Sequence, residues 1–415
     1  MGASDTSSAR LLPFVILLGG VFALGSLGID AILPALSQIA ADLALTNPNI
    51  AQWLVIAFVL GMGLGNLAGG PLSDSYGRKR VIVTGLGMYL GSSVTMYLCS
   101  GLIGNFEYQM EVMMALRVVQ GAGASFATVA ATAMVRDVHN GPAMARIMSF
   151  SMIVFAMMPA VAPFLGKSIA DVAGWPSIFM VFALFAAAIY LYQRVALEET
   201  NTHLTPLSCN ALKESASDVL KIQIVRRVIV AQTLNFSILF SLISTIQPIF
   251  EQTFNSSQSF PGWFAMMALA IAAAGISNGK AVQRIEPLKL ARFALVGQAL
   301  AAGLAFKGLE VVSPGSTGAF CIFMTWGMIS FFCNGFSIGN LTSAALEPSG
   351  EHAGMAATLI ASVPLIGAVA LAAPVTILFD GTPMMLLNVV AIYAGCAAAA
   401  ITIFKKKPIA EHQPA

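Results

Sequence analysis

Long apolar runs recur along the chain with short polar segments between them. A helix needs about 20 apolar residues to cross the hydrocarbon core of a bilayer. Because 57% of the residues are hydrophobic and only 10% are charged, a water-soluble globule could not bury this surface. The sequence therefore predicts an all-α membrane protein with twelve transmembrane helices, at residues 11–36, 50–71, 81–99, 109–134, 147–165, 175–194, 227–250, 262–280, 290–306, 317–342, 354–378 and 383–404.

The longest polar stretch, residues 195–223, divides these spans into two sets of six. It predicts a six-helix bundle at residues 1–194, a linker at 195–225, and a second bundle with a tail at 226–415. A weak second copy of the first polar loop, at Gly275, Gly279 and Arg284, occupies the matching position in the second half. Such repetition predicts two pseudo-symmetric bundles.

The positive charges indicate how the chain lies in the membrane. With both termini in the cytoplasm, 18 of the 21 Lys and Arg residues lie on the inner side. We therefore expect a multi-pass protein of the inner membrane with both termini inside. The net charge of +2 does not favour a nucleic-acid partner, and Lys405, Lys406 and Lys407 are typical of a lipid-facing anchor.

The first inner loop, residues 69–80, is short, polar and strongly basic. Gly70 and Pro71 are expected to end the preceding helix, and Gly77 to permit a tight reversal. Topology alone would explain the cations of this loop, but it would not explain its aspartate or the one that ends the fourth span. The alternative is a cytoplasmic charge cluster of Asp74, Arg78, Arg80 and Asp137.

Asp30 and Arg117 are ionisable residues inside predicted spans, at similar depths. A carboxylate near a helix centre costs roughly 2.5 to 3.5 kcal/mol on insertion scales, so Asp30 predicts a proton-binding function. The alternatives are that Asp30 is solvated near the outer surface or caps the chain before Pro34. Arg117 is interpreted either as a modulator of Asp30 or as a structural residue bound to backbone carbonyls.

Several motifs resemble those of one transporter family. The loop Gly-x-Leu-Ser-Asp-x-x-Gly-Arg-Lys-Arg resembles the signature loop of the major facilitator superfamily. The segment around Arg117 and Gln120 resembles its fourth-helix motif, and the segment with Pro159, Pro163 and Gly166 resembles its antiporter motif. Together these segments resemble the Bcr/CflA-type branch of twelve-helix drug:proton antiporters.

The resemblance implies a division of roles. It places Arg117 and Gln120 in proton coupling, and it makes the loop a latch that closes the inner side. Ser75 and Lys167 depart from the family pattern, in the loop and after Gly166 respectively.

Polar residues in the seventh and tenth spans are candidates for a substrate cavity, although each could instead form an interhelical hydrogen bond. They are Gln232, Asn235, Gln247, Trp326 and Asn334.

The residues exclude several other classes of function. There is no Gly-x-x-x-x-Gly-Lys-Ser/Thr loop for ATP, the five cysteines show no paired spacing, and no His lies in a predicted span. We therefore expect no enzyme, no cofactor and no metal.

The prediction is a monomeric exporter that exchanges small amphipathic compounds for protons. The alternatives are a dedicated exporter of one metabolite or metallophore, a nutrient importer, and a membrane protein that transports nothing.

Overall fold

The computed structural model describes residues 3–101, 108–202 and 204–402. The described residues form helices and connecting turns, with no strand among them. The part before the linker contains two short 3-10 helices, η1 (Leu33–Ala35) and η2 (Pro48–Gln52). Its α-helices are α1 (Ala3–Asp30), α2 (Leu36–Asp42), α3 (Trp53–Tyr76), α4 (Arg78–Gly101), α5 (Gln109–Val138), α6 (Gly141–Ala173) and α7 (Pro176–Ala196).

The linker contains a helix of its own, α8 (Cys209–Lys221), which was not predicted from the sequence. Two further 3-10 helices, η3 (Ser257–Ser259) and η4 (Glu347–His352), lie in later connections. The remaining helices are α9 (Gln223–Gln252), α10 (Phe260–Ala281), α11 (Pro287–Glu310), α12 (Thr317–Leu346), α13 (Ala353–Ile377) and α14 (Pro383–Thr402).

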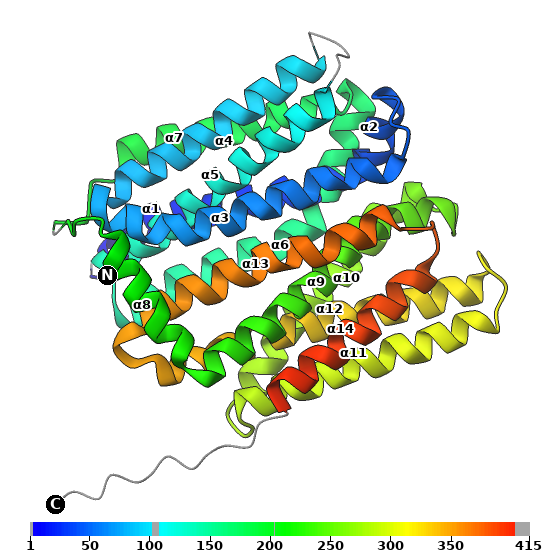
Figure 1. Ribbon diagram of the computed structural model, residues 1–415. Helices are drawn as coiled ribbons and strands as arrows, with labels where there is room; N and C mark the ends of the chain where they lie inside the picture. Colours follow the sequence, from blue (N-terminus) through cyan, green and yellow to red (C-terminus); the bar gives the residue numbers. More distant parts are fainter. Residues whose placement is uncertain (1–2, 102–107, 203, 403–415) are drawn as a thin grey trace, which may run out of the picture.

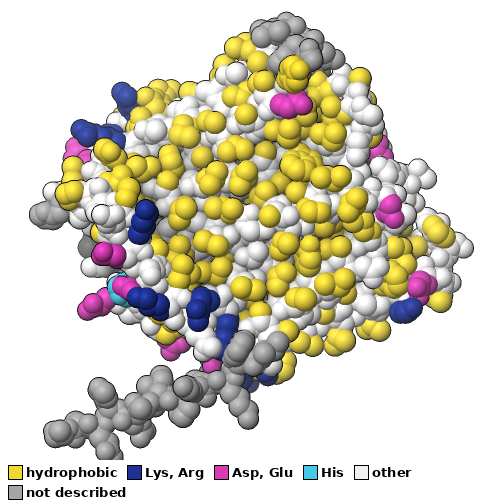
Figure 2. Space-filling model, in the orientation of Figure 1, with side chains coloured by type: hydrophobic (Ala, Val, Ile, Leu, Met, Phe, Trp, Pro, Cys, Tyr) yellow, Lys and Arg dark blue, Asp and Glu magenta, His cyan; other side chains and the backbone are white. Residues whose placement is uncertain are grey.

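The prediction of twelve membrane-crossing helices is confirmed. In the described residues, eleven stretches are long and apolar enough to cross a membrane, and one of them, Thr317–Ile377, is 61 residues long and contains both α12 and α13. The ninth crossing helix, α11, has 24 residues, more than its predicted window. Figure 2 shows the corresponding surface, with a hydrophobic middle and with Lys and Arg side chains gathered toward one edge.

Two predicted helix boundaries, both near prolines, differ from the structure. The first window is interrupted, because α1 ends at Asp30 and the chain resumes as η1. Pro34 lacks the N–H that would bond the carbonyl of Asp30, so one hydrogen bond that would extend α1 past Asp30 cannot form. The prediction that Gly70 and Pro71 end the second helix is wrong, since α3 contains Pro71 and ends at Tyr76. Gly77 makes the reversal, with a φ of 98° that favours glycine.

Two groups of helices lie side by side (Figure 1), α1–α7 and α9–α14. They meet mainly where α3 packs along α13 and where α6 packs along α10. The linker, α8 and the α3–α4 turn lie at one end, which we call the linker end. The opposite end, with α2 and η2, is called the far end. The predicted anchor at Lys405, Lys406 and Lys407 lies outside the described residues.

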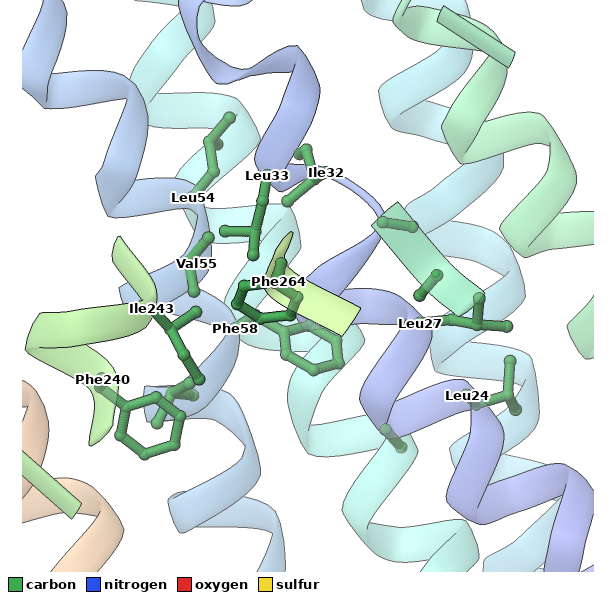
Figure 3. Close-up of a cluster of buried hydrophobic side chains, with 14 of the residues drawn as sticks. Leu24, Leu27, Ile32, Leu33, Leu54, Val55, Phe58, Phe240, Ile243 and Phe264 are labelled. Atoms are coloured by element: carbon green, nitrogen blue, oxygen red, sulfur yellow. The ribbon is translucent and has the colours of Figure 1, made fainter. Parts of the chain in front are cut away.

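An apolar cluster fills the middle of the contact between the two groups (Figure 3). Leu33, Phe58 and Phe264 come from the α1 break, α3 and α10, and all three belong to one buried cluster. Ile243 of α9 lies beside them. Apolar side chains of the two groups therefore pack together at this depth.

Glycines allow α3 and α5 to approach very closely. A Cβ at Gly61 would lie 2.0 Å from the carbonyl oxygen of Val118, and a Cβ at Gly121 would lie 2.0 Å from that of Phe58. Neither position can accept a larger residue unless the helices separate, which is the usual role of small residues at membrane helix contacts. This contact holds the Arg117 segment against α3.

Candidate functional site

Arg117 of α5 is fully buried and bound by backbone oxygens. Its Nε donates to the carbonyl of Leu54 at 2.9 Å, and its guanidinium also donates to the carbonyl of Gly28. The Cζ atom lies 4.4 Å from the centre of the Phe58 ring. These contacts match the structural alternative, in which carbonyls of neighbouring helices hold the cation.

Gln120 extends this arrangement into a chain of hydrogen bonds. Its Oε1 accepts from the Arg117 guanidinium at 2.6 Å, and its Nε2 donates to Ser93 Oγ at 2.7 Å. Ser93 Oγ donates to the carbonyl of Tyr89, whose own hydroxyl donates to the carbonyl of Leu24 at 3.1 Å. Ser93 and Tyr89 of α4 were not predicted as site residues.

Asp30 is the last residue of α1 and is only 3% exposed. This burial removes the alternative of a solvated carboxylate. Ser26 Oγ donates to Asp30 Oδ2 at 2.9 Å, and the described ion pairs include none between Asp30 and Arg117. A buried carboxylate that accepts one described hydrogen bond, from the Ser26 hydroxyl, has little compensation for a charge.

The α6 segment that contains Pro159 and Pro163 contacts the residue after Asp30 at a glycine, Gly166. A Cβ at Gly166 would lie 1.7 Å from the carbonyl oxygen of Ala31, the residue directly after Asp30. Pro159 and Pro163 both lie inside α6 before this contact. α6 therefore lies against the break in α1 at Gly166.

The α3–α4 turn brings together most of the predicted charge cluster. Arg78 Nε donates to Asp137 Oδ2 at 2.9 Å, and the same guanidinium pairs with Asp74. Gly70, one turn earlier on α3, faces Thr358 of α13. Arg80 is exposed and takes part in none of the ion pairs that the described residues form.

Glu199 of the linker completes this turn and was not predicted there. Its carboxylate accepts hydrogen bonds from the backbone N–H groups of Arg78 at 2.9 Å and Lys79 at 3.0 Å. An anion at the first N–H groups of a helix is stabilised by the helix dipole. A Cβ at Gly77 would lie 2.6 Å from this carboxylate, so a glycine is required there for space as well as for its φ.

Four of the predicted cavity residues are buried and incompletely bonded. Within the described chain, Gln232 Oε1, both amide atoms of Asn235, Trp326 Nε1 and Asn334 Oδ1 have no hydrogen-bond partner. They lie on α9 and α12, which contact one another. Buried polar atoms without partners are costly, and a ligand that bonds them would recover that cost.

Gln247 does not join these four residues. It lies at the far end, where its Nε2 donates to Glu251 Oε2 at 3.0 Å, and it also contacts Ser37 across the two groups of helices. Twelve positions along α9 separate Asn235 from Gln247, about 18 Å at 1.5 Å per residue. Gln247 and Asn235 therefore cannot share one small site.

Comparisons with known proteins show the family to which the chain belongs. The family model described as Major Facilitator Superfamily matches residues 17–372. The bicyclomycin resistance protein homolog of Haemophilus influenzae is 28% identical over 359 residues, covering 84% of this chain and 85% of that protein. The multidrug resistance protein MdtL of Escherichia coli is 29% identical over 352 residues, covering 82% of each.

A solved structure gives the same fold. The crystal structure of a D-xylose-proton symporter superposes with a TM-score of 0.73 at 12% identity, covering 95% of this chain and 97% of that one. At this identity the likeness concerns the fold alone. With the match of the family model along most of the sequence, it shows that this chain is a multi-pass membrane protein of the major facilitator superfamily.

Proposed function

We propose that this protein is a proton-coupled antiporter that exports small amphipathic compounds or drugs by alternating access. The observation that carries the proposal is Asp30, a buried carboxylate at a helix break, next to the Arg117 network and in contact with Gly166 through Ala31. The relatives named for bicyclomycin resistance and multidrug resistance support a drug as the cargo.

Asp30 would carry the proton. When Asp30 is neutral, its burial costs little, and Ser26 satisfies it. When Asp30 loses its proton, the charge needs water or a cation, so the break must open toward solvent. Arg117 and Gln120 would hold the walls of the site in place and contribute a fixed positive charge.

The cargo would bind to the second half. Residues 226–415 would form the bundle that supplies Gln232, Asn235, Trp326 and Asn334, and residues 1–194 would form the bundle that supplies the proton site. Residues 195–225 would join the two, and a single copy would contain a complete pathway.

We assign the linker end to the cytoplasm because of its positive charge, and both termini would then lie inside. The contacts of Ser37 with Glu251 and of Asn49 with Phe379 join the two groups of helices at the far end, so this conformation would be closed to the outside. When the protein faces outward, the Asp74–Arg78–Asp137 cluster would act as the inner latch.

The test uses everted membrane vesicles with an acidic interior that is followed by a pH dye. Phenicols, lipophilic cations and fluoroquinolones are added in turn to vesicles with the native protein or with Asp30→Asn at matched expression. We expect several compounds to release protons with the native protein and none with the variant. A native protein that is folded but responds to no compound would refute polyspecific export, and an unchanged response of Asp30→Asn would refute its assigned role.

A further inference from the structure

The linker is fixed to the first group of helices by one part and to the second group by another, and both parts lie at the linker end (Figure 1). Thr205 donates its backbone N–H to the carbonyl of Asp74, in α3, at 3.2 Å. Ser208 is the N-cap of α8, which begins at Cys209 and packs on α9, η4 and α13. Residues 206–208 are therefore the whole connection between the two attachments.

The attachment to the first group consists of several hydrogen bonds. Lys79 Nζ donates to the carbonyl of Leu197 at 2.6 Å, and Leu197 itself is 5% exposed. The carboxylate of Glu199 accepts from the first two N–H groups of α4. Asn201 Nδ2 donates to the carbonyl of Asp74 at 3.1 Å. We call this attachment the strap, and its described residues are 197–202, 204 and 205.

The strap also bonds the charge cluster of the α3–α4 turn. Thr200 Oγ1 donates to Asp137 Oδ2 at 3.1 Å, and Arg78 Nε donates to the same oxygen at 2.9 Å. Asp74, Asp137 and the start of α4 belong to the first group of helices. The strap therefore moves with the first group.

The attachment to the second group is apolar. Val219 of α8 is fully buried in a cluster that includes Leu341 of α12 and Leu359 of α13. Ala216 and Ile222 pack against the same cluster. Apart from Val219, the buried residues of this cluster all lie in α9 and α11–α14. α8 therefore moves with the second group.

The length of chain between the two attachments limits their separation. A fully extended chain covers at most about 3.6 Å per residue, so the steps from Thr205 to Cys209 span roughly 14 Å. Pro206 fixes one of the dihedral angles and restricts the residue before it. If the strap were undocked after Leu197, the free chain to Cys209 would span roughly 43 Å. The connection is short only because the strap is docked.

We propose that the strap, residues 206–208 and α8 form a stop that limits how far the two groups of helices separate at the linker end. This inference rests on the proposed alternating access, in which the linker end widens when the far end closes. As the groups separate, Thr205 and α8 move apart until residues 206–208 are extended. Further separation would break the hydrogen bonds of the strap or the apolar contact of α8.

The test measures distances by double electron–electron resonance on the full-length protein in lipid nanodiscs. Spin labels are attached at Thr84→Cys in α4 and at Glu351→Cys in η4, in a chain whose five native cysteines are replaced by serine. Both positions are exposed, and neither lies in the strap or in α8. Distances are recorded at acidic and at alkaline pH, so that the two protonation states of the transporter are sampled.

The first variant has Gly-Ser-Gly-Ser inserted between Pro206 and Leu207. Each added residue gives up to about 3.6 Å of reach, so we expect the longest distance to increase by several ångströms. The same insertion between Ser313 and Pro314 is the matched control, because the α11–α12 connection joins helices of one group. The control should give the distances of the native protein.

The second variant combines Thr200→Ala, Glu199→Ala and Asn201→Ala, which removes the described side-chain hydrogen bonds of the strap to the first group. It should also give the longer distance, whereas Glu198→Ala should not. An insertion variant that folds but keeps the native longest distance would overturn the stop. If the insertion variant does not fold, an unchanged distance in the second variant has the same meaning. A single distance in every protein at both pH values would refute alternating access, and the stop with it.

Discussion

Two regions of the molecule treat their buried polar side chains in opposite ways, the surroundings of Arg117 and the polar residues of α9 and α12. Around Arg117, the described polar groups are connected, from the carbonyls of Gly28 and Leu54 through Gln120 to Ser93. On α9 and α12, buried amides and an indole N–H have no partner in the described chain. The first arrangement is complete without a ligand, and the second is not.

This difference indicates that the surroundings of Arg117 are rigid and that the polar groups of α9 and α12 can adapt to different ligands. A fully bonded buried network has a single favourable geometry, which suits a group that must be held the same way in every cycle. Unbonded polar groups cost stability but can serve cargoes of different shape. Mutations should therefore have opposite consequences in the two regions.

The largest effect is expected from Arg117→Lys. Lysine keeps the charge but cannot bond two carbonyls and Gln120 with a planar fork. Each buried group left unpaired costs about 1 to 3 kcal/mol, so we expect lost transport and a clearly lower melting temperature in detergent. Asp30→Asn is the control, since its amide can still accept from Ser26 and should leave the melting temperature nearly unchanged. An Arg117→Lys variant of native stability would show that the network is not fixed.

We expect an effect of intermediate size from Gln120→Leu. Asn235→Leu also removes a buried amide, but the two variants should differ in stability. Gln120→Leu removes partners of Arg117 and Ser93 and should destabilise the protein by about 1 to 3 kcal/mol. Asn235→Leu removes unbonded groups, so stability should stay equal or rise, while KM for exported compounds rises severalfold. Thermal unfolding and vesicle transport measure the two quantities. Equal destabilisation by both changes would contradict the proposed difference between the two regions.

The smallest effect is expected from Glu199→Gln in the linker. The neutral amide has one oxygen, so it can accept from the N–H of Arg78 or of Lys79 but not from both, and it loses its attraction to the helix dipole, worth about 0.3 to 1 kcal/mol. The loss should shrink at high salt. Glu198→Gln, at the adjacent position, is the matched control. Hydrogen exchange at residues 78–80 should increase in Glu199→Gln alone, and equal exchange in both variants would contradict this contact.

The sequence was sufficient for the number of spans because membrane-length apolar runs leave few alternatives. It did not reveal the break in α1, since hydropathy does not change across Ala31 and Ile32, although Pro34 was a usable signal. The sequence also predicted that the second helix ends at Pro71, but α3 continues to Tyr76. Neighbouring helices can compensate for a proline inside a membrane helix.

The partners within the candidate site were harder to predict. Arg117 is bound partly by carbonyls of Gly28 and Leu54, and backbone groups have no signature in a sequence. Glu199 meets Arg78 from more than a hundred residues away. Gln247 could have been separated from Asn235 by counting the rise along one helix, because depth follows directly from residue number.

The linker is attached to both groups of helices, but by different parts. Residues 197–201 bond the first group through Lys79 and Glu199, whereas α8, which begins after the Ser208 N-cap, packs on α9 and α13. The two halves could therefore be made as separate polypeptides and reassembled, provided that the chain is divided between Thr205 and Ser208. If the chain were divided before Glu199 instead, the first polypeptide would lack the carboxylate that bonds the first N–H groups of α4.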